Sequence, residues 1–178
     1  LAPLQQGILF HYLLQEQGDV YVTTGLIVFK DEERLKQFVE NINVVATRHD
    51  ILRTAFLWEG LSEPVQVVCR KALLRLQWLS ADGEGSAETR LNAYVDRSYY
   101  RINVHKAPLY EAIAIHDKKN NRYLLQIPRH HLVMDHTTMD LLIGEVALIQ
   151  QGRRDELPEP VPFRNFVAQA RLGGSEAE

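Results

Sequence analysis

Hydrophobic residues along the chain alternate between helical spacing and every-second-residue spacing, which predicts helices interspersed with strands. A helical pattern follows Pro3 and closes at Gly18, and proline suits a first helical position because its missing N–H is not needed there. The β-branched and aromatic run at 20–29 predicts a strand. Asp31 is the expected N-cap of a second helix, which carries the chain into Arg48-His49-Asp50.

The rest of the pattern continues this mixture. It predicts a hairpin over 52–58 and 64–69, a strand over 73–79, a helix over 87–101, strands over 108–116 and 122–128, a helix over 137–151 and a last helix over 163–172. Thr137 is the expected N-cap of the helix at 137, and Asp140 would complete a capping box. Hairpins beside helices favour an α/β fold of the α+β kind, with a mixed sheet flanked by helices.

Composition and charge exclude several classes of protein. The chain has 178 residues, 46% of them hydrophobic, which suits one globular domain. The net charge is −3 and no basic cluster is present, so nucleic acid is not an expected partner. No apolar window reaches the length of a membrane span, so a membrane is not an expected partner. A lone cysteine, Cys69, excludes a disulfide framework and favours a cytoplasmic location.

Three of the seven histidines lie in the short run His130 to His136, with Asp135 among them. An apolar strand pattern precedes this run and a helix pattern follows it. A strand sends neighbouring side chains to opposite faces, so His130 and His131 are expected to point in different directions. The cluster is therefore the candidate functional site.

Three interpretations of the cluster compete. A metal site is disfavoured, because adjacent histidines lack the spacings that bind zinc. A structural role, in which polar side chains satisfy a buried loop, stays open. Acyl transfer, with a histidine assisting removal of a proton, is favoured. Since the run holds no serine or cysteine to accept an acyl group, the transfer is expected to be direct between two bound substrates.

Three stretches resemble one family, the condensation domains of nonribosomal peptide synthetases. The run HHLVMDH at 130–136 is similar to the HHxxxDG motif of that family. The run RHDILRTAF at 48–56 resembles its RHExLRTxF motif, and PLQQGILFHYLL at 3–14 resembles its opening motif. The order and rough separation of the three stretches match as well.

The resemblance implies a chloramphenicol-acetyltransferase-like fold and an amide-bond-forming, acyltransferase-type enzyme. Residues 1–178 would be the N-terminal lobe of the domain, with 152–178 as a connector and terminal helix leading to a C-terminal lobe. The implied partners are that lobe, an adjacent adenylation domain, and the donor and acceptor peptidyl carrier proteins, which bring substrates on phosphopantetheine. The lobe itself would bind no cofactor or metal and would be inactive alone.

The resemblance also implies roles for individual residues. His131 would be the catalytic histidine, which takes a proton from the attacking amine or positions it. His130 would be structural and turned from the channel. Asp135 would form a buried ion pair with an arginine of the second motif, and we favour Arg48 over Arg53.

Two positions depart from the family pattern. His136 stands where the family has a glycine that permits unusual backbone angles. The stretch from Leu9 to Asp19 resembles domains that take a D-configured donor, with His11 on the donor side. It nearly matches the extended motif of dual epimerising and condensing domains, but Tyr12 replaces the second histidine. An epimerisation domain, a dual domain and a non-catalytic module that docks carrier proteins therefore remain alternatives.

Overall fold

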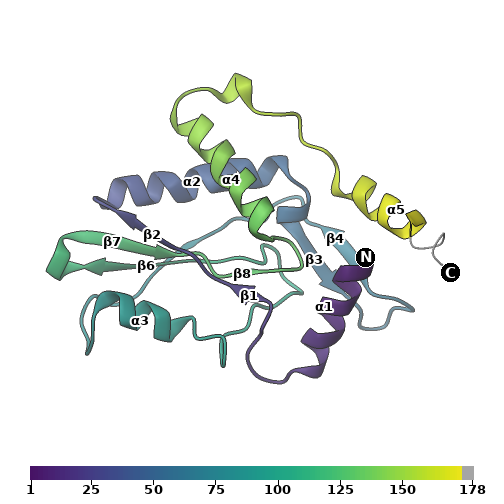
Figure 1. Ribbon diagram of the computed structural model, residues 1–178, viewed down its shortest axis with the longest axis horizontal. Coiled ribbons are helices and arrows are strands. Elements are labelled where there is room, and N and C mark those ends of the chain that lie inside the picture. The colour runs from purple at the N-terminus through teal and green to yellow at the C-terminus, as the bar shows by residue number, and fades with distance from the viewer. Residues whose placement is uncertain (174–178) are drawn as a thin grey trace.

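The computed structural model describes residues 1–173 and shows helices on both faces of a mixed sheet (Figure 1). The helices are α1 (Pro3–Leu14), α2 (Glu32–Arg48), α3 (Ala87–Tyr94), α4 (His136–Gln150) and α5 (Phe163–Gly173). The strands are β1 (Val22–Thr23), β2 (Leu26–Phe29), β3 (Thr54–Leu57), β4 (Val65–Val68), β5 (Leu76–Trp78), β6 (Ala112–Asp117), β7 (Arg122–Gln126) and β8 (Arg129–His130).

The largest sheet has the strand order β2-β7-β6-β5, and two smaller antiparallel pairs, β1-β8 and β3-β4, lie beside it. In the largest sheet β5 runs parallel to β6, whereas β2-β7 and β6-β7 are antiparallel. The predicted mixed sheet is therefore confirmed. The predicted hairpin is confirmed as β3 and β4, with Thr54 opposite Val68.

Strand β6 shows how the sheet separates two hydrophobic clusters. Ala112 and Ala114 face the main core beneath α2, while Ile113 and Ile115 pack with residues of α3. All four side chains are fully buried. A strand covered on both faces has to be apolar throughout, which is why this segment lacks the alternation of a half-exposed strand.

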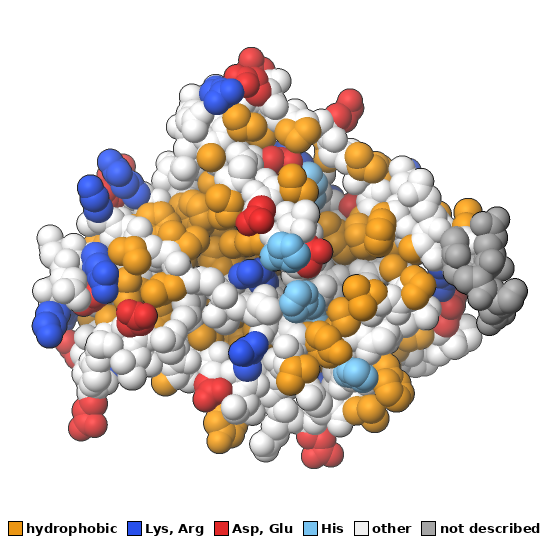
Figure 2. Space-filling model, in the orientation of Figure 1, with side chains coloured by type: hydrophobic (Ala, Val, Ile, Leu, Met, Phe, Trp, Pro, Cys, Tyr) orange, Lys and Arg blue, Asp and Glu red, His pale blue; other side chains and the backbone are white. Residues whose placement is uncertain are grey.

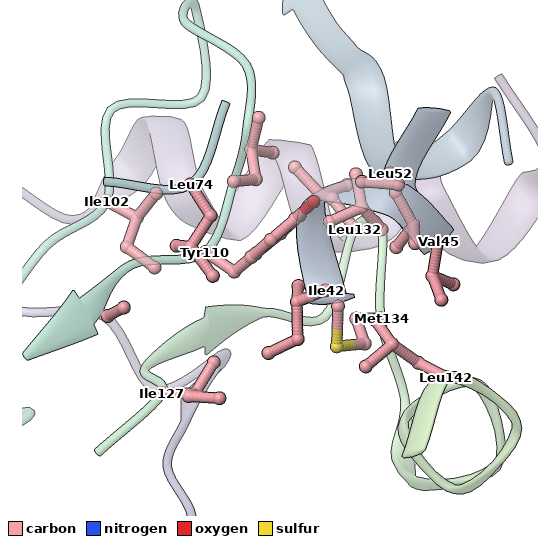
Figure 3. Packing of buried hydrophobic residues seen from close by; sticks show 14 of the residues in the cluster. Ile42, Val45, Leu52, Leu74, Ile102, Tyr110, Ile127, Leu132, Met134 and Leu142 are labelled. Atoms are coloured by element: carbon pink, nitrogen blue, oxygen red, sulfur yellow. The ribbon is translucent and has the colours of Figure 1, made fainter. Parts of the chain in front are cut away.

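The main core continues from the sheet into the segment that follows β8. Figure 3 shows Leu132 and Met134 of this segment in the same cluster as Ile42 of α2 and Leu142 of α4. Leu132 and Met134 are almost completely buried. The histidine turn, as we call residues 130–135, is thus anchored from below by apolar side chains. Burial of each such side chain contributes about 1.5–3 kcal/mol.

Several predicted elements are shorter than expected, among them β5, which covers only Leu76–Trp78 of the predicted strand over 73–79. The predicted strand at 20–29 breaks after β1, because β1 pairs with β8 while β2 pairs with β7. The predicted helix at 87–101 ends at Tyr94. There Asp96 accepts hydrogen bonds from the N–H groups of Ser98 and Tyr99, through its side chain and its carbonyl respectively. Such a local turn competes with continuation of the helix.

The loop after α1 makes a close approach that only glycine permits. Gly18 has a φ of 66°, and a Cβ there would lie 2.4 Å from the carbonyl oxygen of Arg97. Arg101 donates to the carbonyls of Tyr12 and Gln15 at 2.6 Å each, which satisfies the end of α1. The loop from Gln15 to Tyr21 is therefore held against residues 97–101.

We expect Gly18→Ala to lower the free energy of unfolding by at least about 2 kcal/mol, because it adds a backbone clash to the left-handed strain. Gly60→Ala is the matched control, since Gly60 has a φ of 71° but open space around its Cβ position. The control should cost about 1 kcal/mol. Urea unfolding of the two variants measures the difference, and equal losses would contradict the close approach.

Candidate functional site

The histidine turn joins β8 to α4 and places its two histidines on opposite sides. The His130 N–H donates to the carbonyl of Leu109, and the His131 N–H donates to the carbonyl of Tyr21, both at 2.9 Å. The carbonyl of His130 accepts from Val133 and Met134, which closes the turn. Figure 2 shows histidine side chains gathered on the face where α1, β8 and the start of α4 meet.

His130 points into the interior, and its side chain is fully buried. Its Nδ1 accepts a hydrogen bond from the Leu132 N–H at 3.1 Å. Its Nε2 lies 2.9 Å from Oδ2 of Asp19, which is also fully buried, although the two atoms are not in hydrogen-bonding geometry. The ring of Tyr12 meets the imidazole edge-on at 5.7 Å. The side chain of His130 therefore points inward, as predicted.

His131 points the other way and is half-buried. Its ring has no hydrogen-bond partner among residues 1–173, so both nitrogens are open to a ligand. Burial lowers the pKa of the His131 imidazole, and the carboxylate of Asp135 opposes that shift in part. His130, Arg129 and His136 lower the pKa further. A neutral imidazole at neutral pH follows from this environment.

Two hollows meet at His131. The α1 hollow has a volume of about 480 Å³ and is lined by Pro3, Leu4, Gly7, Ile8, His11, Tyr21 and His131. The α5 hollow, of about 440 Å³, is lined by residues of α1, the histidine turn and α5, among them Gln5, His131, Asp135, Thr138 and Phe166. Both linings are mainly apolar with a few polar groups, as is typical of sites for organic ligands.

His11 lies in the α1 hollow together with His131. Nδ1 of His11 is 2.7 Å from the hydroxyl of Tyr21, whose backbone carbonyl holds His131. Tyr12, the next residue, is buried on another face of α1, where its hydroxyl donates to the carbonyl of Ile102. Three ionisable side chains therefore line this hollow: those of His11, Tyr21 and His131.

The predicted buried ion pair of Asp135 is wrong. Asp135 is exposed, and its carboxylate accepts a hydrogen bond of 2.7 Å from the Thr138 N–H. It is thus the N-cap of α4, in place of Thr137, which was the expected cap. This hydrogen bond lowers the pKa of Asp135. The helix starts two residues earlier than the capping-box pattern indicated, because the turn brings Asp135 within reach of the first free N–H groups.

The two candidate arginines have other partners. Nε of Arg48 donates to Glu145 of α4 at 3.0 Å, and His49 Nε2 lies 2.8 Å from the other oxygen of that carboxylate. Arg48 also donates to the carbonyl of Pro158. Arg53 donates to the carbonyls of Ala46 and Cys69. Both arginines brace the fold away from Asp135, since α4 presents Glu145 and not Asp135 to α2.

His136 is the first residue of α4 and is exposed. Asn121 is the one non-glycine residue with a positive φ in the described part of the chain, so His136 needs no left-handed conformation. The conformational freedom of a glycine is therefore not required here. Its ring lies 3.3 Å from the hydroxyl of Thr137 and beside the turn.

Sequence reasoning missed three buried polar residues, of which Gln5 and Asp19 contact the histidine turn. Glu145 shares the buried stripe of α4 with Leu142 and Val146, so its helical spacing was a usable signal. Gln5, also buried, donates to the carbonyl of Leu132 and accepts from Ala2 and Gln66. Asp19 contacts His130 across more than a hundred residues of sequence, and no local pattern indicates such a contact.

Among residues 1–173, no group of three or more histidine, cysteine, aspartate or glutamate side chains is placed to hold a metal ion. The same residues contain no helix that is long and apolar enough to span a membrane.

Comparison with known proteins decides the family. The model of the condensation domain family matches residues 1–177. The chain belongs to the condensation domains of nonribosomal peptide synthetases. The fold agrees, because the chain superimposes on the first condensation domain of the calcium-dependent antibiotic synthetase with a TM-score of 0.75 at 18% identity. The expected chloramphenicol-acetyltransferase-like fold is thereby confirmed.

The similar proteins are much longer than this chain. Malpinin synthetase of Mortierella alpina is 42% identical over 99% of the chain, which spans 2% of that synthetase. Malpibaldin synthetase of the same organism is 40% identical over 97% of the chain, which spans 3% of it. A linear gramicidin synthase of Brevibacillus parabrevis is 33% identical over 94% of the chain, which spans 3% of it. In the superposition on the solved condensation domain, 99% of this chain aligns with 44% of that domain's chain.

Glu145→Ala should destabilise the domain by about 2–4 kcal/mol, because it leaves Arg48 partly buried without its carboxylate. The side chains of Glu145 and Arg48 are 7% and 24% exposed. Glu32→Ala is the control: its pair with Lys36 is exposed, so it should cost less than about 1 kcal/mol. Denaturant unfolding compares the two, and similar small losses would show that the Glu145 cluster contributes little.

Asp135 should behave as a helix cap and not as half of a buried pair. Asp135→Ala should cost about 1 kcal/mol and Asp135→Asn a few tenths, because asparagine also caps helices. A buried ion pair would instead cost about 3–5 kcal/mol in either variant. Because the folded-state pKa is lowered, the contribution of the wild-type carboxylate is present at neutral pH. It is lost as the pH falls below about 4. Unfolding measured across that range tests both expectations.

Proposed function

We propose that this chain is the N-terminal lobe of a condensation domain that forms peptide bonds between carrier-bound substrates. The observation that carries this proposal is His131, a half-buried imidazole with no hydrogen-bond partner in the described residues, where two apolar hollows meet. The family match over residues 1–177 supports the same reaction. A degenerate docking module would have no need to keep such an open histidine.

In the proposed reaction, the acceptor amine attacks the carbonyl carbon of the donor thioester. A C–N bond forms, the C–S bond breaks, and the phosphopantetheine thiol of the donor carrier leaves. His131 takes or directs the amine proton, for which a neutral imidazole is needed. The lowered pKa of His131 keeps the imidazole neutral. The proton then protonates the departing thiolate, so His131 is restored.

The rest of the domain is proposed to complete the site. This chain covers 44% of a solved condensation domain, and it leaves Leu4, Phe10 and Leu14 of α1 largely exposed. We infer that a C-terminal lobe covers part of this apolar face and forms the second wall of the channel, so this lobe has no condensation activity alone. Donor and acceptor peptidyl carrier proteins and an adjacent adenylation domain are the proposed partners, in the cytoplasm.

His11 is the basis for a proposal on the donor. It lines the same hollow as His131 and is hydrogen-bonded to Tyr21, so it lies where a donor acyl group would reach. A D-configured donor is the proposed substrate. The dual epimerising alternative has less support, because buried Tyr12 offers no second base to the hollow.

His131→Ala in the synthetase that carries this chain should lower the rate of peptide-bond formation to about 1% of the wild-type rate or less, since general-base assistance is worth about 10²–10⁴. Single-turnover transfer between preloaded carrier domains is the measurement. His105→Ala is the control, because His105 packs against Trp58 in a tilted ring contact and lines neither hollow. Unchanged transfer in His131→Ala would refute the catalytic role.

The pH dependence of transfer should reflect the lowered pKa of His131. Activity requires the neutral imidazole, and protonation of the acceptor amine lowers the rates of wild type and His131→Ala alike. The ratio of the two rates should therefore stay constant as the pH falls through about 6.5, the ordinary histidine value, and should drop only at lower pH. A ratio that already declines above pH 6.5 would contradict this assignment.

A further inference from the structure

A carboxylate lies directly behind the histidine turn, in the loop that follows α1. Asp19 and His130 are both fully buried, and Oδ2 of Asp19 is 2.9 Å from Nε2 of His130. The other carboxylate oxygen accepts the Tyr21 N–H at 2.9 Å. A buried carboxylate is costly unless groups of opposite polarity surround it. Packing alone therefore does not account for its place beside His130.

The hydrogen bonds of His130 define where its proton lies. The Leu132 N–H donates to Nδ1, so Nδ1 is an acceptor and the ring proton is on Nε2. Nε2 lies 2.9 Å from Oδ2 of Asp19, and their attraction is electrostatic because the two atoms are not in hydrogen-bonding geometry. A carboxylate beside Nε2 stabilises this tautomer, as outer partners do for histidines at catalytic sites.

The same contacts lead to His131. Asp19 accepts from the Tyr21 N–H, while the Tyr21 carbonyl accepts from the His131 N–H. On the other side, Asp19 lies against the His130 ring, whose Nδ1 accepts from the Leu132 N–H. The backbone before and after His131 is thus held by two routes that both start at Asp19.

The loop that carries Asp19 is itself held firmly. The Asp19 N–H donates to the carbonyl of Arg97 at 3.1 Å, and Gly18 packs against the same backbone. Arg101 reaches the carbonyl of Gly18 at 3.3 Å. The carboxylate is therefore presented to His130 from a rigid support.

We propose that Asp19 is a positioning residue for the reaction: through the tautomer of His130 and the carbonyl of Tyr21, it sets the orientation of His131. This rests on the proposed function, in which His131 handles the amine proton. Asp19 touches no substrate, so its effect falls on the rate of transfer and not on substrate binding. Misplacement of a catalytic group by about 1 Å costs on the order of 10²-fold in rate.

The test uses Asp19→Asn in the synthetase that carries this chain. The substitution keeps an oxygen for the Tyr21 N–H and removes the negative charge beside His130. We expect single-turnover transfer to slow about 10–100-fold, as for loss of an outer-shell partner. The carrier concentration at half saturation should change less than about twofold, because the hollows are untouched. Asp31→Asn is the control, since Asp31 is exposed and caps α2.

A double variant separates positioning from general loosening of the fold. His130→Gln keeps an N–H group for Asp19 but loses the acceptor for Leu132. If Asp19 acts through His130, the transfer rate of the double variant, Asp19→Asn with His130→Gln, should lie within about twofold of the rate of the slower single variant. The proposal would be overturned if the rate loss of the double variant equalled the product of the two single losses. A rate in Asp19→Asn within twofold of the wild-type rate would overturn it as well.

A second variant keeps the test informative if Asp19→Asn does not fold. His130→Asn places an amide near Nδ1 and loses the contact with Asp19, so it should show the same rate loss at unchanged half saturation. A wild-type rate in this variant would overturn the proposal. Failure of the proposed function is recognised separately. In that case His131→Ala would keep the wild-type rate of transfer, irrespective of the result for Asp19→Asn.

Discussion

The short antiparallel pair of β1 and β8 is the constraint on which the site depends. It places Val22 opposite His130, with both side chains fully buried, so that His131 has to leave the strand on the other side. One histidine is thereby used to fix the turn and its neighbour is left open. The apolar residues that follow, Leu132 to Met134, fasten the turn to the core beneath it. Orientation of the open histidine thus follows from burial of its neighbours.

Much of the fold was predictable, because it follows local rules. Pro3 opens α1, Asp31 caps α2, and the mixed sheet follows from hairpins beside helices. The break between β1 and β2 was not predictable, since it arises from a change of partner strand. The early end of α3 results from the Asp96 turn, which a continuous helical pattern hides. Tertiary pairing decides the first break, and a local turn decides the second.

For the site, adjacent histidines in a strand made the division of His130 and His131 predictable. The acidic partner of Arg48 was not predictable. The family motif pointed to Asp135, whereas the structure pairs Arg48 with Glu145 of α4. The phase of α4 decides the matter, because Glu145 lies on its buried stripe and Asp135 at its N-terminus. Asp19 reaches His130 only through the folded chain, so one sequence alone does not reveal the pair.

The central claim is that the open imidazole of His131 lies where the thioester carbonyl and the attacking amine meet. The most direct measurement is a crystal structure of the complete domain with a non-hydrolysable donor acyl-pantetheine amide bound. The amide carbonyl should lie in the hollow shared by His11, Tyr21 and His131, with space for an amine within hydrogen-bond reach of the His131 ring, about 3 Å. A donor carbonyl bound elsewhere, with His131 buried under the second lobe, would contradict it.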